Sequence, residues 1–291
     1  MRPGGLDRVP APVLVVAAIA SVQTGSAVAR TVFDEAGALG ITLMRLGFSA
    51  LLLVVVVRPR PWRWSRPAVL AALVFGLTMA AMNLSFYQAL RTVPLGVAVT
   101  VEFLGPLSVA LVQTRRVRDL VWVVLAGTGV ALLGLGGGDD VALSGLAFAA
   151  LAGGFWACYI LASARVGQLL PGTAGLAVAL TAAAVVALPF GASGVLDVLD
   201  QPSVLAIGLV VAVLSSLVPY AFELAALRRI PTRVFGVLMS MEPAAAALAG
   251  LVVLGQSLDG RELTALVLVS LASLGVTIGR KESDPPPVDS P

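Results

Sequence analysis

Two glutamates stand inside long apolar runs of the sequence, and each has a proline close behind it. Glu102 precedes Pro106 by four residues, and Glu242 directly precedes Pro243. A charge at the centre of a bilayer costs at least about 2.5–3.5 kcal/mol, so such a residue usually faces a cavity or a partner. Because proline has no N–H, the carbonyl groups of residues 102 and 239 each lose a helical hydrogen bond. We therefore predict two bent helices that place these carboxyl groups at a midplane site for substrate or protons.

Other polar residues interrupt the apolar runs and are candidates for lining the same site. Arg45 could pair with Glu102 or hold a substrate carboxylate, or it could snorkel to the interface or form a structural ion pair. The remaining candidates for substrate or proton binding are Gln23, Thr24, Asn83, Tyr87, Trp156 and Tyr159. Their alternative role is interhelical hydrogen bonding or an aromatic position at the interface. For Glu102 and Glu242 the alternative is a structural carboxylate bonded to neighbouring groups.

Several classes of site are excluded by composition. The chain has no histidine and a single cysteine, Cys158, so the commonest metal ligand and general base are missing, and no metal site is expected. There is no phosphate-binding loop, HExxH, GxSxG or CxxC pattern. Gly136-Gly137-Gly138-Asp139 matches the GxGD pattern of intramembrane aspartyl proteases, but no aspartate lies within any expected helix to serve as the second catalytic group. We expect neither enzyme activity nor a cofactor.

Long apolar helices are the elements that must position these groups. The chain of 291 residues is 58% hydrophobic and 12% charged, with a mean hydropathy of +0.99, whereas a soluble domain carries about 25% charged residues. A membrane-spanning helix needs roughly 20 apolar residues. Ten runs fit: 12–30, 37–57, 68–89, 94–114, 120–136, 144–164, 174–191, 204–226, 233–254 and 261–279. The sequence predicts an all-α integral membrane protein with ten transmembrane helices.

The basic residues predict the orientation in the membrane. With a cytoplasmic N-terminus, fifteen lysines and arginines fall on the cytoplasmic side and three on the other, with Arg45 inside a helix. Both termini are therefore expected in the cytoplasm of a bacterium, with a multi-pass chain in its inner (cytoplasmic) membrane and a disordered cytoplasmic tail at 280–291. Near the cytoplasmic end of the run 204–226, Glu223 is expected to pair with Arg228 or Arg229 rather than with substrate. The arginines lie in short clusters between apolar runs, so no nucleic-acid partner is expected.

An internal repeat relates the two halves of the chain. Ala89-Leu90-Arg91 recurs as Ala226-Leu227-Arg228 at an offset of 137 residues, and Pro94 and Pro231 share that offset, as do Pro106 and Pro243. The alternative is chance similarity between alanine-rich helices. We predict two five-helix repeats, 1–136 and 144–279. An odd number of helices per repeat inverts the second copy, which is a common architecture of secondary transporters. Although Ala27-Val28-Ala29 resembles a signal-peptidase site, the repeat needs the first helix, and cleavage is not expected.

Two segments carry a resemblance to a known family. They are Tyr87-Gln88-Ala89-Leu90-Arg91 continuing through Glu102-Phe103-Leu104-Gly105-Pro106, and Leu227-Arg228-Arg229-Ile230-Pro231-Thr232 continuing to Ser240-Met241-Glu242-Pro243. The chain resembles the EamA family of the drug/metabolite transporter superfamily, and within it most of all the threonine/homoserine exporters of RhtA type.

The resemblance implies a ten-helix bundle with a central cavity, alternating access and export of amino acids driven by the proton gradient. By motif position it points to Glu102 and Glu242 as site residues, with Tyr87 and Pro106 in support. The small four-helix members of the superfamily use a glutamate in their first helix, where this chain has only Gln23 and Thr24, so their mechanism does not transfer residue by residue.

The expected function is export of small neutral amino acids such as threonine or homoserine. A zwitterion would suit a site that offers Glu102 to the ammonium group and Arg45 to the carboxylate. Because a low dielectric disfavours a charged carboxyl group, Glu102 or Glu242 could exchange a proton and couple transport to the proton gradient. The alternatives are an exporter of other metabolites or drugs, and a membrane sensor or assembly protein without transport activity. The expected partners are a small-molecule substrate, protons and membrane lipid, with the chain as a monomer or homodimer.

Overall fold

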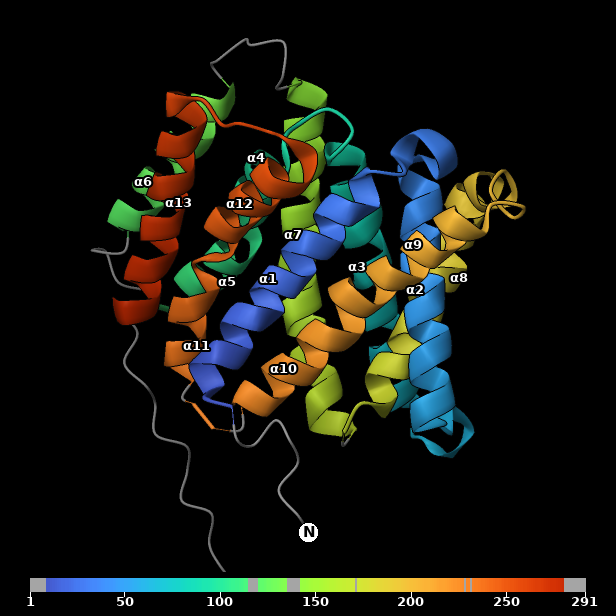
Figure 1. Cartoon of the computed structure of the whole chain (residues 1–291). Helices are drawn as coiled ribbons and strands as arrows, with labels where there is room; N and C mark the ends of the chain where they lie inside the picture. Colours follow the sequence, from blue (N-terminus) through green and yellow to red (C-terminus); the bar gives the residue numbers. More distant parts are fainter. Residues whose placement is uncertain are drawn as a thin grey trace, which may run out of the picture.

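A computed structural model describes residues 9–114, 120–134, 142–170, 172–227, 229–230 and 232–279 (Figure 1). Within these ranges the chain forms helices and no strand, as the predicted all-α class requires. The tail 280–291, the Gly136–Asp139 segment and the boundary between the two expected repeats lie outside the described residues.

The helices follow one another with short connections. The first half contains α1 (Ala11–Arg30), α2 (Phe33–Val57), the 3-10 turn η2 (Pro61–Arg63), α3 (Arg66–Ala89), α4 (Leu95–Glu102), α5 (Leu104–Thr114) and α6 (Leu120–Gly134). The second half contains α7 (Leu143–Leu169), α8 (Ala174–Leu196), α9 (Pro202–Ala212), the π-turn η4 (Val213–Leu217), α10 (Val218–Leu227), α11 (Thr232–Met239), α12 (Glu242–Leu254) and α13 (Gly260–Gly279).

Six described segments are long and apolar enough to cross a bilayer. They are α1, α2, α3, α7, α8 and the segment Val237–Leu254, and three shorter apolar helices cover Leu95–Val109, Leu120–Leu133 and Pro202–Leu217. Large apolar side chains point outward along them; Val56, Leu143 and Val252 are more than 70% exposed. Such surfaces are unfavourable in water and favourable against lipid. The molecule is therefore a multi-pass membrane protein.

Three helices are interrupted near prolines. α4 ends at Glu102 and α5 begins at Leu104, with Pro106 in its first turn. α11 ends at Met239 and α12 begins at Glu242, with Pro243 directly after it. The third interruption, η4, is one that the apolar run 204–226 did not predict. There the N–H of Val218 donates to the carbonyl of Val213, an i to i+5 bond, just before Pro219.

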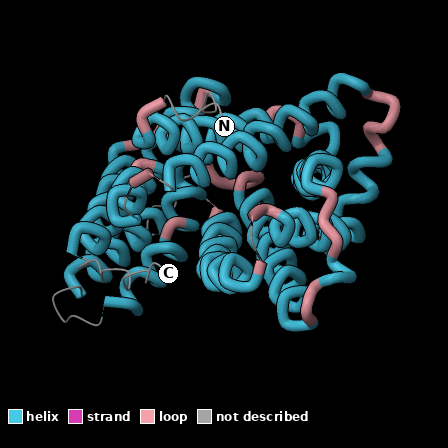
Figure 2. Tube along the Cα trace, turned by 90° about the horizontal axis from the view of Figure 1, so that it is seen from below, coloured by secondary structure: helices cyan, strands magenta, loops and turns pink. Residues whose placement is uncertain are grey.

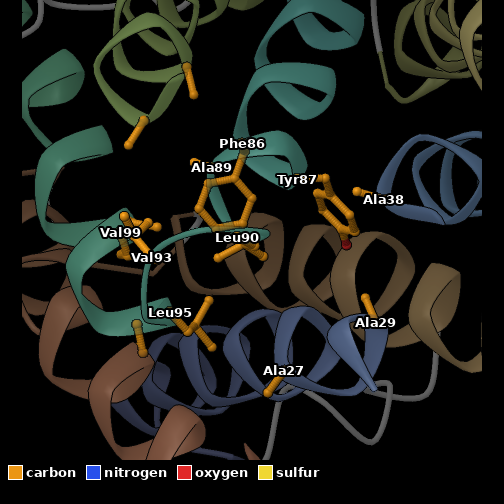
Figure 3. Packing of buried hydrophobic residues seen from close by; sticks show 14 of the residues in the cluster. Ala27, Ala29, Ala38, Phe86, Tyr87, Ala89, Leu90, Val93, Leu95 and Val99 are labelled. Carbon is orange, nitrogen blue, oxygen red and sulfur yellow. The ribbon is translucent and has the colours of Figure 1, made fainter. Parts of the chain in front are cut away.

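Helices from the two halves of the chain interleave. α2 packs on α8, α3 on α7, α4 on α12 and α6 on α13, while α1 crosses α10 and α12 (Figure 1). Seen from below, the described chain consists of helices joined by short loops (Figure 2). The largest apolar cluster contains residues of α1, α2, α3 and α4 from the first half and of α7, α9 and α12 from the second. Figure 3 shows Phe86 and Tyr87 of α3 in this cluster, with Leu90 directly after α3, Leu95 of α4 and Ala27 of α1 nearby. The interior therefore belongs to both halves rather than to either alone.

The break between α4 and α5 lies directly on the backbone of α7. A Cβ placed on Gly153 would lie 2.6 Å from the carbonyl oxygen of Glu102, and a Cβ on Gly105 would clash with the carbonyl oxygen of Gly153. Small residues allow membrane helices to approach this closely. The break at Glu102 is thus held in place by a backbone-to-backbone contact.

We predict opposite effects for two adjacent glycine substitutions in α7. Gly153→Ala should destabilise the protein by about 1–3 kcal/mol because the methyl group overpacks the Glu102 backbone. Gly154→Ala should be neutral or stabilising, because nothing lies within 4 Å of a Cβ there and alanine is the better helix former. Thermal unfolding of both variants in detergent measures the difference. Equal melting temperatures for the two variants would contradict the close contact.

Candidate functional site

Arg45 is the central buried cation of the described structure. Its side chain lies on α2 with only 9% of its surface exposed. One terminal nitrogen, Nη1, donates to the hydroxyl of Tyr87 at 3.3 Å, and the other, Nη2, donates to the carbonyl of Ser215 at 3.0 Å. The third nitrogen, Nε, is buried and has no hydrogen-bond partner. Arg45 therefore retains one unused donor that points into the protein interior.

Tyr87 supports Arg45 from α3. The tyrosine is fully buried, and its ring centroid lies 5.6 Å from the guanidinium carbon, within range of a cation–π interaction. Phe33 and Phe86 each lie 5.9 Å from it between ring centroids, and Figure 3 shows it beside Ala38 of α2. These neighbours fix the ring, so its hydroxyl is held where Arg45 can reach it.

Two buried carboxyl groups come from the helix breaks. Glu102, at the end of α4, is 8% exposed, and Glu242, at the start of α12, is 6% exposed. Arg45 acts electrostatically on Glu102, and both Glu102 and Glu223 act on Glu242. The structure thus brings the three charged residues predicted for the site, together with Glu223, into one electrostatic neighbourhood.

These opposite charges are close but not paired. In the described part of the chain, neither carboxyl group forms an ion pair with Arg45 within 4.0 Å. One oxygen of Glu242, Oε2, is buried without a hydrogen-bond partner. Buried ionic groups without partners are costly, and the unpartnered Nε of Arg45 and Oε2 of Glu242 can each form a hydrogen bond with a ligand.

Glu223 was expected to pair with an arginine next to α10. Arg228 lies outside the described residues, and the guanidinium of Arg229 donates to the carbonyls of Ala225 at 3.2 Å and Val9 at 2.8 Å. The interaction that the structure gives for Glu223 is the one with Glu242. Glu223 therefore joins the carboxyl cluster.

Two of the other predicted residues lie on α1. Gln23 is buried, and its Oε1 has no hydrogen-bond partner, while Thr24 is half-buried. An unpartnered buried amide oxygen is suited to receiving a hydrogen bond from a ligand. Gln23 thus has the features of a site residue, whereas for Thr24 the structure gives burial alone.

The predicted residues of α3 and α7 divide into different surroundings. Asn83 is buried, but its Nδ2 donates to the carbonyl of Met79 in its own helix at 2.8 Å. Trp156 contacts Phe103, the residue after Glu102, edge to face with 5.6 Å between ring centroids. Tyr159 instead packs against Phe75, 4.9 Å away, in a separate apolar cluster. Trp156 therefore neighbours the carboxyl cluster, and Tyr159 is not brought together with Tyr87.

Three serines around η4 were missed by sequence reasoning. The carbonyl of Ser215 accepts the bond from Arg45, the hydroxyl of Ser21 donates to the carbonyl of Leu214 at 2.7 Å, and that of Ser49 donates to the carbonyl of Ala212 at 3.4 Å. The available signal was Pro219, four residues after Ser215, because a proline there leaves the Ser215 carbonyl without its regular helical donor.

The chemistry of this arrangement is recognition of opposite charges. Within the described ranges no group of three or more histidine, cysteine, aspartate or glutamate side chains could hold a metal ion. The arginine offers a donor to an anionic group, and the carboxyl groups offer acceptors to a cationic one. A small molecule that carries both charges fits this set.

Comparison with known proteins identifies the family. The EamA-like transporter family model matches residues 143–278. The threonine/homoserine exporter RhtA of Escherichia coli strain K12 is 43% identical over 288 residues, 97% of each chain, and RhtA of Salmonella typhimurium strain LT2 is 43% identical over 282 residues, 95% of each chain. A solved crystal structure of a protein with 18% identity matches with a TM-score of 0.58 over 92% of this chain and 96% of that one, which shows a shared fold.

These relatives are transporters, so the expectation that the chain is not an enzyme is confirmed. They are bacterial, and together with the long apolar helices they support the predicted multi-pass location in the inner membrane. On identity, coverage and the family match, the chain belongs to the EamA-like transporter family.

Proposed function

We propose that this protein exports small neutral amino acids of the threonine/homoserine kind by alternating access coupled to the proton gradient. The names of its RhtA relatives support the substrate class. The observation that carries the proposal is the buried Arg45, which acts on Glu102 without forming an ion pair with it, beside Glu242, which in turn interacts with Glu102.

A zwitterionic amino acid completes the site on both sides. Its carboxylate receives the unused N–H of Arg45 Nε, and its ammonium group donates to Glu102. Both are charge-assisted hydrogen bonds, which are roughly twice as strong as neutral ones. A hydrophobic cation would engage the carboxyl groups and leave Arg45 Nε without a partner. The arginine therefore favours an amino acid over the alternative of a cationic drug.

Alternating access follows from two inverted repeats, residues 1–136 and 144–279, with ten membrane crossings and both termini in the cytoplasm. The packing supports this arrangement. In such a repeat, α1 corresponds to α7, α2 to α8, and α3 to the helix formed by α9 and α10. The contact of α3 with α7 then has its counterpart in the contact of α10 with α1, and the contact of α3 with α8 has its counterpart in that of α9 with α2. The pairs α2–α8 and α6–α13 each join two corresponding helices. A two-fold relation between the halves produces this pattern.

Proton coupling rests on the carboxyl cluster. Glu242 interacts with Glu102 and with Glu223, and like charges this close in a low dielectric repel each other strongly. Exchange of a proton on Glu242 relieves this repulsion and changes the charge of the site as the substrate ammonium group arrives or leaves. The site is built from one chain, so a monomer is sufficient for the proposed cycle.

The substrate proposal predicts the behaviour of site variants in proteoliposomes. Labelled threonine should be taken up by the wild type, and Arg45→Gln and Glu102→Gln should each lower uptake at least tenfold, because each removes a charge-assisted bond to substrate. The matched controls Arg91→Gln and Glu35→Gln remove exposed charges and should leave uptake unchanged. Inhibition by hydrophobic cations, with no effect of threonine or homoserine, would favour the drug-exporter alternative instead.

The coupling proposal predicts that Glu242→Gln separates exchange from driven transport. Threonine–threonine exchange across the vesicle membrane should persist within about threefold, because the Arg45 and Glu102 contacts remain. Accumulation driven by a pH gradient should be lost, because the site can no longer exchange its proton. Both activities are measured in the same vesicle preparation, with Glu35→Gln as control. Gradient-driven accumulation that survives in Glu242→Gln would rule out this residue as the coupling group.

The topology is tested by cysteine labelling in a Cys158→Ser background, since Cys158 is exposed. Asp34→Cys, at an exposed position in the first turn of α2, should react with a membrane-impermeant maleimide in intact spheroplasts. Trp62→Cys, in η2 after α2 and 76% exposed in the native tryptophan, should react only after the membrane is permeabilised. The reverse pattern would place both termini outside the cytoplasm.

A further inference from the structure

The π-turn η4 leaves one backbone carbonyl for Arg45. In a regular α-helix the carbonyl of Ser215 would accept the N–H of residue 219, but residue 219 is proline and has no N–H. Arg45 Nη2 takes that place with a bond of 3.0 Å from a different helix. An unpartnered carbonyl in a membrane interior is costly, so the bond satisfies both groups at once.

Two carbonyls that precede this one in the chain accept hydrogen bonds from hydroxyl groups of neighbouring helices. Ser21 of α1 holds the carbonyl of Leu214, and Ser49 of α2 holds that of Ala212. Elsewhere in the described helices, hydroxyl groups such as those of Thr42 and Thr100 donate to the carbonyl four residues earlier in their own helix. The π-turn is therefore fixed against α1 and α2 by side chains that reach across from both.

A close approach of α1 to η4 adds to these contacts. A Cβ on Gly25 would clash with the hydroxyl oxygen of Ser215, and that oxygen is buried without a hydrogen-bond partner. Gly25 lies one helical turn after Ser21, so the two residues face η4 together. Any side chain at residue 25 would push the turn, and with it the Ser215 carbonyl, away from α1.

We propose that Pro219 and Gly25 are positioning residues for recognition of the substrate carboxylate, a role that rests on the proposed function. Pro219 releases the Ser215 carbonyl and Gly25 sets its position. That carbonyl, together with the hydroxyl of Tyr87, fixes the plane of the Arg45 guanidinium so that Nε is presented to substrate. An arginine recognises a carboxylate through a planar fork of N–H groups, so the orientation of the plane decides whether the bonds form.

The test is the preference of the transporter for a carboxylate. In proteoliposomes containing the full-length protein, uptake of labelled threonine is inhibited with unlabelled threonine and with threoninol, the amino alcohol in which a CH2OH group replaces the carboxylate. The ratio of their half-inhibitory concentrations reports the contribution of carboxylate recognition. The wild type should prefer threonine by roughly tenfold or more, the value of a hydrogen bond between charged groups, and Arg45→Gln should abolish the preference.

Pro219→Ala and Gly25→Ala should reduce the preference toward that of Arg45→Gln. Pro219→Ala supplies an N–H that competes for the Ser215 carbonyl, and Gly25→Ala displaces the π-turn. The matched controls should keep the wild-type ratio: Pro189→Ala, at an exposed proline inside α8, and Gly47→Ala, on the same helix as Arg45 with nothing within 4 Å of its Cβ. A purely structural defect would raise the half-inhibitory concentrations of both ligands by the same factor and leave their ratio unchanged.

The outcomes separate the two proposals. A wild type that takes up threonine with no preference over threoninol, or an Arg45→Gln variant that retains the preference, would overturn the carboxylate site itself. An Arg45→Gln variant that loses the preference while Pro219→Ala keeps it would overturn only the positioning role. Should Gly25→Ala not fold, Pro219→Ala decides the matter alone, since replacement of a helical proline by alanine relieves rather than adds strain.

Discussion

A guanidinium group in the interior of a membrane protein is the constraint on which the site depends. Arginine stays protonated in proteins, so Arg45 cannot relieve its burial by losing its charge. It must find acceptors, and it finds them in the Tyr87 hydroxyl on α3 and the Ser215 carbonyl on η4. One acceptor belongs to the first half of the chain and the other to the second. The hydrogen bonds that stabilise this one buried cation therefore link the two halves of the chain.

The interrupted helices follow from the same need. A regular helix satisfies all its own carbonyl groups and offers none to a buried ligand or side chain. Prolines 106, 219 and 243 each withhold one N–H, and near each the chain departs from regular α-helix. Such irregular backbone is tolerated at membrane depth only where protein surrounds it. Gly153 beside Glu102 and Gly25 beside Ser215 provide that cover, because only a residue without a side chain lets a second helix come so close.

The sequence alone allows a residue to be proposed for the site where the indication lies in its immediate sequence neighbours. An ionisable side chain in an apolar run is visible without a structure, which is why Arg45, Glu102 and Glu242 could be named in advance. The role of Ser215 could not, because its partner Arg45 is 170 residues away and only the packing of α2 against α9 and η4 brings them together. Helical spacing also misleads where a side chain bonds within its own helix. Asn83 lies four residues from Tyr87, yet its amide nitrogen donates to the carbonyl of Met79.

In the proposed mechanism, the charge balance of the site connects substrate recognition with energy coupling. Glu242 interacts with Glu102 and Glu223, and Arg45 acts on Glu102, so if all four groups were ionised the site would carry net negative charge inside a low dielectric. A zwitterion brings no net charge and cannot correct this imbalance, although it pairs with groups of both signs. Protons can correct it, because they bind the carboxyl groups that the substrate leaves unpaired. In the proposed cycle, selectivity for a zwitterion and coupling to protons therefore have the same origin, which is the excess of acidic groups over arginine among these four residues.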